Sequence, residues 1–284
     1  MALLTELADK LPAAFQECRK IVEQADADRA VSLSFVPPEL QGPVAALYAF
    51  DIETARIAAM VSQPLPGEIR LQWWRDRLNN PDDLGQGSPV AQALLATVER
   101  FSLPLDAFER FLEARIFDLY NDPMPGRSEF EAYAGETTAT VIMLVAMVLD
   151  REVANQIADA AGHAGVACLA SSALMHEERH RALRQNFVPG DVLASTGLQG
   201  GDWLTEDSAT LRPARLAIAA YASEHLRQVE AQLPSLASKI RPAILPALCC
   251  RTLLNRIVAG GGTQVTQGIG PVRRSWLYWR AMRR

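Results

Sequence analysis

The chain has 284 residues, of which 49% are hydrophobic, and it carries a formal net charge of −5. The apolar content is enough for a sizeable core, and the acidic balance argues against nucleic acid as a partner. The four cysteines lack the spacing of a metal site and predict free thiols in a reducing compartment.

Helical periodicity runs through the chain, and no stretch alternates in the manner of a strand. Pro and Gly clusters separate the helices by short loops, so we expect one all-α domain over residues 1–270 and a tail over residues 271–284. The sequence predicts helices over residues 3–24, 38–63, 64–78, 89–100, 104–120, 128–133, 136–149, 151–184 (one long helix or two that abut), 213–233 and 242–258.

No predicted helix has the composition of a membrane span. The longest apolar run, residues 141–149, is far shorter than the roughly 20 residues that a spanning helix needs. The N-terminus has early acidic residues and is not typical of a signal peptide. We therefore expect a cytoplasmic protein, or one that is peripheral on the inner membrane.

The helical pair over residues 44–78 is the most informative stretch of the chain. Its two halves are separated by Pro64 and Pro66-Gly67, and each half has apolar residues at spacings of three and four. This predicts two amphipathic helices, whose buried stripes are formed by Val44, Leu47, Tyr48, Ile52 and Ala55, and by Ile69, Leu71, Trp74 and Leu78.

Several short motifs lie in this stretch and beyond it. They are Ser34-Phe35, Leu47-Tyr48-Ala49-Phe50, Gly67-Glu68-Ile69-Arg70-Leu71, Trp74-Arg75, Asp118-Leu119, Tyr133 and Phe187-Val188-Pro189. In their order and spacing, which are more specific than any one motif, they resemble the squalene/phytoene synthase family. The resemblance implies an isoprenoid synthase-type helical bundle around a central cavity.

The same resemblance implies a set of ligand-binding residues. Catalytic members of the family join two prenyl diphosphates head to head, so we expect a prenyl or other apolar ligand in a largely apolar cavity. We expect the helices that hold Tyr48, Tyr133 and residues 167–173 to line it. The predicted ligand-binding residues are Ser34, Phe35, Tyr48, Phe50, Asp51, Arg70, Tyr133 and Thr137.

Catalytic family members hold magnesium with aspartates that lie four residues apart on each of two facing helices. Aligned on Phe50, the first pair of positions falls on residues 55–59, which read Ala-Arg-Ile-Ala-Ala. Asp51 and Glu53 lie two residues apart and point in nearly opposite directions on a helix, so they cannot chelate one ion. We expect them to form a partly solvated face or local ion pairs.

The second pair of positions, counted back from Pro189 to within one residue, falls on His176 and His180. Arg56 at the first site would repel a metal ion. We therefore predict no catalytic residue, no metal site and no cofactor, with magnesium required only if the protein is an active transferase.

Residues 176–180 also match the His-Glu-x-x-His pattern of zinc hydrolases, with Glu177 as the base. The intervening positions are Glu178 and Arg179, which are charged, and no third ligand follows. A solvated, charge-rich helical face is the preferred interpretation, and a zinc hydrolase is a remote alternative.

The tail differs in composition from the rest of the chain. Residues 271–284 contain five arginines, two tryptophans, one tyrosine and no acidic residue. This composition suits an anionic membrane interface. The alternative is that the aromatic residues pack onto the body of the protein while the arginines are solvated.

Two functional hypotheses follow from these patterns. The first is a non-catalytic protein that keeps a prenyl-binding cavity and acts in assembly of a membrane complex, since the resemblance extends to a branch whose mitochondrial members are assembly factors for a respiratory complex. Its partners would be an apolar ligand and a membrane surface or membrane-complex subunit. The second is an active prenyl transferase with an unusual diphosphate site.

Overall fold

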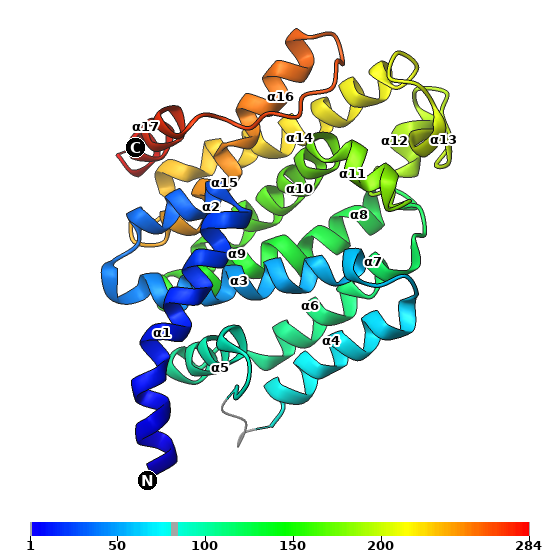
Figure 1. Cartoon of the computed structure of the whole chain (residues 1–284). Helices are drawn as coiled ribbons and strands as arrows, with labels where there is room; N and C mark the ends of the chain where they lie inside the picture. The colour runs from blue at the N-terminus through cyan, green and yellow to red at the C-terminus, as the bar shows by residue number, and fades with distance from the viewer. Residues whose placement is uncertain (1, 81–84, 284) are drawn as a thin grey trace.

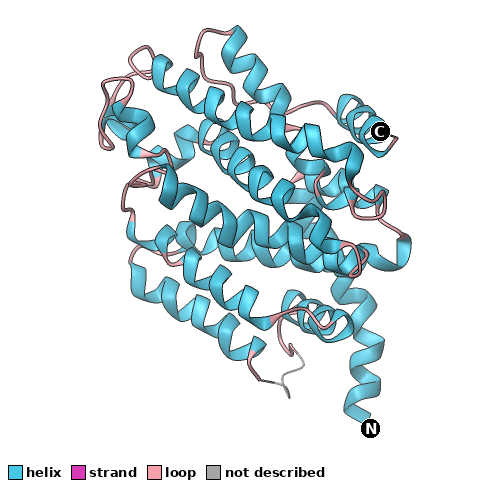
Figure 2. Cartoon of the chain, turned by 180° about the vertical axis from the view of Figure 1, so that it is seen from behind, coloured by secondary structure: helices cyan, strands magenta, loops and turns pink. Residues whose placement is uncertain are grey.

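The computed structural model describes residues 2–80 and 85–283 and shows a bundle of helices (Figure 1). Every regular element in these residues is helical, and short loops connect the helices (Figure 2). The predicted all-α fold is confirmed.

The first half of the chain forms the lower part of the bundle in Figure 1. Prolines lie in the first turn of several of its helices, where their missing N–H is not needed. Its helices are α1 (Ala2–Ala25), α2 (Ala27–Ser32), α3 (Pro38–Met60), α4 (Pro64–Leu78), α5 (Pro89–Phe101), α6 (Leu105–Arg115), α7 (Phe117–Tyr120) and α8 (Arg127–Ala134).

In the second half, a π-helical turn, η2 (Gly135–Ala139), joins α8 to α9 (Thr140–Leu149). Short 3₁₀ turns lie at residues 154–157, 233–235 and 241–243. The remaining helices are α10 (Ala158–Met175), α11 (Glu177–Ala182), α12 (Gly190–Ala194), α13 (Asp202–Thr205), α14 (Arg212–Gln232), α15 (Leu245–Leu248), α16 (Cys250–Ala259) and α17 (Pro271–Met282).

Helix α10 lies in the middle of the bundle and packs against α14, η2, α8 and α16. Its buried face consists mainly of alanine, which allows close approach of neighbouring backbones. A Cβ atom on Gly165 would lie 2.9 Å from the carbonyl oxygen of Ala134, so only glycine permits this crossing. The small residues of α10 therefore set the spacing of the core.

Two helical segments have the length and hydropathy of a membrane span, Arg127–Leu149 and Ala154–Met175. More than half of each is buried inside the bundle, as is usual for the core helices of a globular fold. Their apolar character is thus explained by the central position of α9 and α10.

The predicted stripe of α4 is confirmed in part. Leu71, Trp74 and Leu78 are buried, whereas Ile69 is 61% exposed. The prediction for Ile69 was wrong because helical spacing identifies a face without showing whether another element covers it. In Figure 1, α4 lies at the outer edge of the bundle.

Candidate functional site

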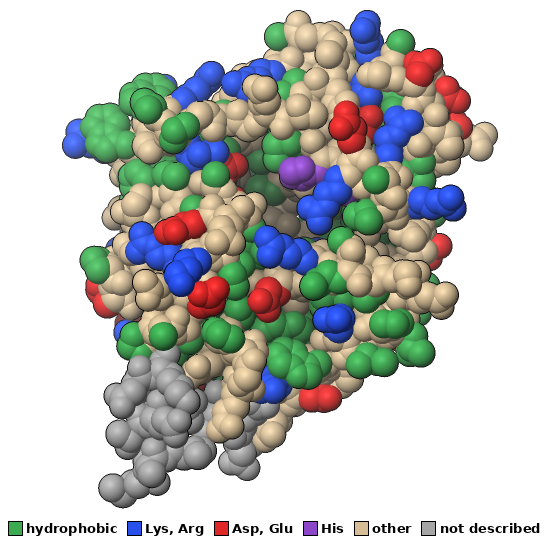
Figure 3. Space-filling model, viewed as in Figure 1, with side chains coloured by type: hydrophobic (Ala, Val, Ile, Leu, Met, Phe, Trp, Pro, Cys, Tyr) green, Lys and Arg blue, Asp and Glu red, His purple; other side chains and the backbone are tan. Residues whose placement is uncertain are grey.

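A pocket of about 280 Å³ opens between α3 and the junction of α10 with α11. In Figure 3 it is the hollow at the centre of the face, with histidine and basic side chains at its rim. Apolar atoms line part of it, including those of Ile52, Leu169 and Phe187. A second hollow, beside the C-terminus of α3, shares Asp118 and Gln185 with it.

The fold brings the two stretches that correspond to the family's aspartate motifs to this one pocket. Ala55, Arg56 and Ala59 line it from α3, and His176 and His180 line it from the opposite wall. Helix α10 ends at Met175, and His176 leaves helical geometry (φ −105°, ψ 22°) before α11 begins. Residues 151–184 therefore contain two abutting helices.

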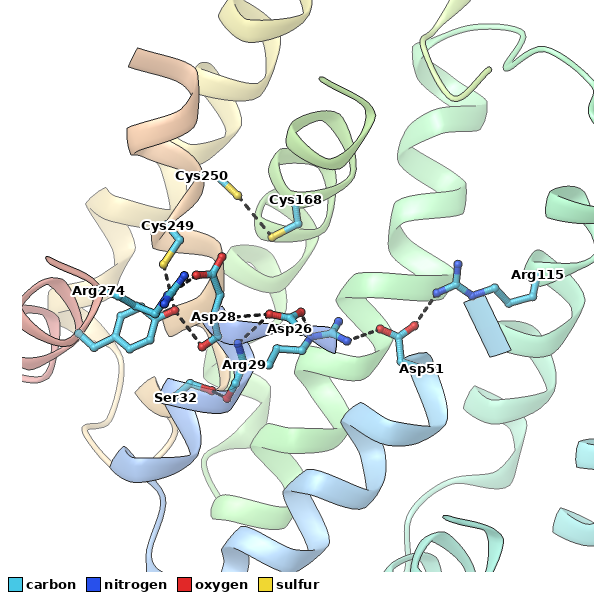
Figure 4. A network of polar contacts seen from close by, with 11 residues as sticks. Asp26, Asp28, Arg29, Ser32, Asp51, Arg115, Cys168, Cys249, Cys250 and Arg274 are labelled. Atoms are coloured by element: carbon cyan, nitrogen blue, oxygen red, sulfur yellow. Dashed lines mark hydrogen bonds and ion pairs between the residues drawn. The ribbon is translucent and has the colours of Figure 1, made fainter. Parts of the chain in front are cut away.

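Behind the pocket, Asp51 lies between two arginines that come from distant parts of the chain (Figure 4). Its carboxylate pairs with Arg29 Nη1 at 2.6 Å and with Arg115 Nη2 at 2.5 Å. Arg115 also donates to the hydroxyl of Tyr133 at 2.8 Å, and that hydroxyl donates to Asp118 at 2.6 Å. These side chains form a buried network that supports the pocket wall.

The prediction of a partly solvated Asp51 was wrong, although the prediction of an ion pair was right. Asp51 is 6% exposed. Burial opposes its ionisation, but the attraction of Arg29 and Arg115 outweighs burial and lowers the pKa of Asp51. At Asp118 burial prevails over the attraction of Arg115 and raises the pKa.

The unpaired charges of the pocket are positive. The guanidinium groups of Arg56 and Arg179 line it and make no hydrogen bond or ion pair within 4 Å to any residue that the structure describes. The two carboxylates of the lining already have partners: Asp118 bonds Tyr133 and Arg115, and Asp26 caps α2 by accepting from the N–H groups of residues 28 and 29. An anion therefore meets two guanidinium groups that hold no hydrogen bond there, of which Arg56 also attracts the nearby carboxylate of Glu53.

The two imidazoles of the wall respond to the same environment. Burial, followed by the charges of His176 and Arg179, lowers the pKa of His180 to about 4. Burial and Arg179 also lower the pKa of His176. Both rings are consequently neutral at neutral pH and offer one donor and one acceptor each.

The predicted ligand-binding residues are distributed unevenly around the site. Tyr133 lines the pocket, and Asp51 reaches it through Arg115. Tyr48 is buried with its ring under the guanidinium of Arg29, 5.0 Å from the centroid. Thr137 is buried and donates to the carbonyl of Tyr133 at 2.6 Å.

Phe50 lies on the side of α3 that faces away from the pocket. Its ring centroid is 5.1 Å from that of Trp74, 5.7 Å from Phe108 and 5.1 Å from Phe111. The expected cavity-lining part of α3 is therefore displaced by about one turn, from residues 48–50 to residues 52–59. The pocket is also more polar than the largely apolar cavity that we expected.

The other three predicted ligand-binding residues lie outside the pocket lining. Ser34 is exposed and donates to the carbonyl of Val31 at 2.6 Å. Phe35 packs edge-on against Tyr278 at 5.9 Å between centroids. Arg70 is exposed on α4. Their ligand-binding role stays a prediction.

The expected solvated face at residues 176–180 was wrong for Glu177. Its carboxylate is 2% exposed and accepts two hydrogen bonds of 2.7 Å from Arg215 of α14. A zinc-hydrolase base must face the metal and its bound water, whereas this carboxylate is held by a buried guanidinium. Glu177 thus joins α11 to α14.

Sequence reasoning missed Arg29, Arg115 and Arg179 as parts of the site. Arg115 precedes Asp118 by three residues, which was the one local signal for their pairing. Arg29 and Asp51 are brought together only by the packing of α2 near α3. Arg179 was noted only as a charge on a helical face.

Comparison with known proteins identifies the family. A family model described as squalene/phytoene synthase matches residues 22–280. The complex I assembly factor 6 of Rattus norvegicus is 27% identical over 250 residues, which cover 87% of this chain and 74% of the relative. The corresponding protein of Homo sapiens is 26% identical over 247 residues, covering 84% and 72%.

Solved structures show the same fold at low sequence identity. Squalene synthase HpnC from Alicyclobacillus acidocaldarius superimposes with a TM-score of 0.73 and 19% identity, covering 90% of this chain and 97% of that one. A dehydrosqualene synthase in complex with a ligand gives a TM-score of 0.78 and 13% identity, covering 97% of both chains. The chain belongs to the squalene/phytoene synthase family.

Proposed function

We propose that this protein is a non-catalytic member of the family that binds an apolar ligand with an anionic head directly, without magnesium, and serves in assembly of a respiratory membrane complex. The proposal rests on the positive charge of the pocket. Arg56 and Arg179 lie where a bound anion would be, and the carboxylates of the lining have partners.

Magnesium does not suit this donor set. The ion prefers hard oxygen ligands, usually carboxylates and waters. The positions that correspond to the family's aspartates hold Ala55, Arg56, Ala59, His176 and His180. Among the residues that the structure describes, no group of three or more His, Cys, Asp or Glu side chains is placed to hold a metal ion. The proposed binding therefore involves no magnesium ion.

Arginine is well suited to take over the role of the metal toward an anion. Its guanidinium donates in a fixed fork that matches phosphate oxygens, and it stays charged at all physiological pH values. The neutral imidazoles of His176 and His180 add donors beside it. The apolar part of the lining, with Ile52, Leu169 and Phe187, would contact the hydrocarbon of the ligand.

The assembly role is supported by the relatives. Those of mouse, rat, cattle and human carry the name complex I, assembly factor 6. Such a role requires a binding site and a docking surface, and it requires no ionisation of a diphosphate. We infer that this chain acts on a corresponding membrane complex.

We expect no squalene, phytoene or cyclopropyl diphosphate from the purified protein with farnesyl or geranylgeranyl diphosphate and magnesium. Ionising an allylic diphosphate needs stabilisation of the leaving group, to which each polarising metal contributes several kcal/mol. Product analysis by chromatography with mass spectrometry checks this. Any head-to-head product above a boiled-protein blank would establish the transferase alternative.

The arginines are tested by binding. With EDTA present, replacement of Arg56 or Arg179 by Gln should weaken farnesyl diphosphate binding about 10- to 100-fold each, since a hydrogen bond to a charged group is worth about 1.5–3 kcal/mol. The same variants should weaken the binding of farnesol, which lacks the charge, much less. Arg100→Gln on α5 is the matched control, because this arginine is exposed and lines neither hollow. Equal weakening by all three variants would contradict the proposed site.

A further inference from the structure

The C-terminal helix α17 has two faces of opposite character. Its inner face docks on α2 and α15. Tyr278 is fully buried, and its hydroxyl donates to the carbonyl of Asp28 at 3.1 Å and lies 3.0 Å from the Cys249 sulfur. Arg274 is 7% exposed and pairs with Asp28 (Figure 4). Residues 274, 278 and 281 thus fix the helix on the bundle.

The outer face of α17 exposes large apolar side chains to solvent. Val272 is 83% exposed, Trp276 54% and Trp279 47%. These positions are spaced by four and three residues and therefore lie on one face, opposite the face that holds Tyr278. Their exposure shows that no helix of residues 2–80 and 85–283 covers them.

Arginines border this apolar stripe. The guanidinium of Arg280 lies 5.5 Å from the ring centroid of Trp276, and that of Arg283 lies 4.1 Å from the ring centroid of Trp279. Arg273 is also exposed. Figure 3 shows basic and hydrophobic side chains together over α17, at the upper left. The described part of the helix contains no acidic residue.

We propose that the outer face of α17, defined by Val272, Arg273, Trp276, Trp279, Arg280 and Arg283, docks on an anionic lipid surface. Tryptophan prefers the boundary between headgroups and hydrocarbon, because its ring is apolar and its N–H needs a polar partner. Arginines beside it meet lipid phosphates. Because the inner face is already fixed to the bundle, the whole domain would be held at the membrane.

Charge complementarity selects lipid over another protein as the occupant. The stripe is narrow, a single helix wide, and its cations stand next to rings that can enter the interface. An acidic protein would also pair with the arginines, but each exposed tryptophan ring lies beside a guanidinium, which is the arrangement that suits the boundary between anionic headgroups and hydrocarbon. The net charge of −5 opposes approach to an anionic surface, but screening over about 8 Å at physiological salt makes the local basic patch dominant.

The contribution of the arginines can be measured by flotation with vesicles of phosphatidylcholine, with and without one-third phosphatidylglycerol. Each arginine at an anionic surface is worth about a five-fold change in binding. The variant Arg273→Gln/Arg280→Gln/Arg283→Gln should therefore lose about 100-fold in binding to the anionic vesicles. Binding of the unchanged protein should fall at high salt.

The apolar stripe is tested by Trp276→Ala/Trp279→Ala, which should lower vesicle binding at least about ten-fold at any salt concentration. Its melting temperature should stay close to that of the unchanged protein, because neither ring is part of the core. The matched control is Ile69→Ala/Trp73→Ala, which removes exposed apolar side chains from α4 and should leave flotation unchanged.

Two results would overturn the proposal. One is that the Trp276→Ala/Trp279→Ala variant, the control variant and the unchanged protein all float equally well with the vesicles, or that none of them floats. The other is a large loss of thermal stability in the tryptophan variant with vesicle binding retained, which would show that the rings pack on the bundle. Neither result affects ligand binding in the pocket, so the two proposals fail separately.

Discussion

Replacing Asp51 by alanine is expected to lower the free energy of unfolding by about 3–5 kcal/mol. The carboxylate lies between Arg29 and Arg115, whose side chains are only 14% and 11% exposed. Its removal leaves two buried cations that have lost their shared and shortest ion pair, with only Asp26 at 3.5 Å from Arg29 and Asp118 at 3.2 Å from Arg115 as remaining carboxylate partners. Chemical denaturation followed by circular dichroism measures the loss.

The conservative variant separates charge from packing. Asp51→Asn keeps the volume and one acceptor, and it should still be destabilised because the charge is gone. Asp191→Ala is the control, since Asp191 pairs with Arg127 at 2.7 Å but both side chains are about half exposed. An exposed pair is worth less than about 1 kcal/mol. A loss at Asp51 no larger than that of the control would contradict the buried network.

The sign of the pH dependence follows from the lowered pKa of Asp51. A carboxyl with a lowered pKa in the folded protein contributes stability above its unfolded pKa of about 3.9 and loses it as the pH falls through the folded value. The contribution of Asp51 is therefore fully present at neutral pH. The difference in free energy of unfolding between the unchanged protein and the Asp51→Asn variant, measured by chemical denaturation at several pH values, should therefore shrink only in strong acid.

Replacing Glu177 by alanine is expected to have an effect of similar size, about 3–5 kcal/mol. Glu177 and Arg215 are 2% and 1% exposed and are joined by two hydrogen bonds of 2.7 Å. The guanidinium also donates to the carbonyl of Ser208 at 2.9 Å. Without Glu177, the positive charge of Arg215 stays buried with only neutral partners.

An exposed pair with the same chemistry provides the control. Glu224 accepts two hydrogen bonds from Arg227, as Glu177 does from Arg215, but both side chains are more than half exposed. Glu224→Ala should change the free energy of unfolding by less than about 1 kcal/mol. A zinc-hydrolase role for Glu177 makes the opposite prediction, namely little change in stability and loss of a metal-dependent hydrolysis.

The sequence predicted most of the long helices because their signals are local, but it gave residues 271–284 only as a tail, where the structure has the helix α17. Prolines at residues 38, 64 and 89 lie at the start of helices in the structure, and the apolar residues 136–149 form the end of a buried helical segment. The motifs that resemble the family also predicted the fold. Such features depend on neighbours within one or two turns, which the sequence displays directly.

The site was harder to predict because its contacts join distant positions. Asp51 and Arg115 are 64 residues apart, and Glu177 and Arg215 are 38 residues apart. Helical spacing placed Leu47 and Tyr48 correctly on a buried face, but it did not show that Phe50 packs against Phe108 and Phe111. Likewise, nothing local shows that Ile69 and Trp73 lie at the edge of the bundle.

The central claim is that the pocket binds an anion with its own arginines in place of a metal. The most direct test is the dissociation constant of farnesyl diphosphate measured by titration calorimetry, once with EDTA and once with excess magnesium. We expect tight binding with EDTA and equal or weaker binding with magnesium, since the ion competes for the diphosphate that Arg56 and Arg179 hold. Binding that requires magnesium, and that survives Arg56→Gln and Arg179→Gln, would contradict the account.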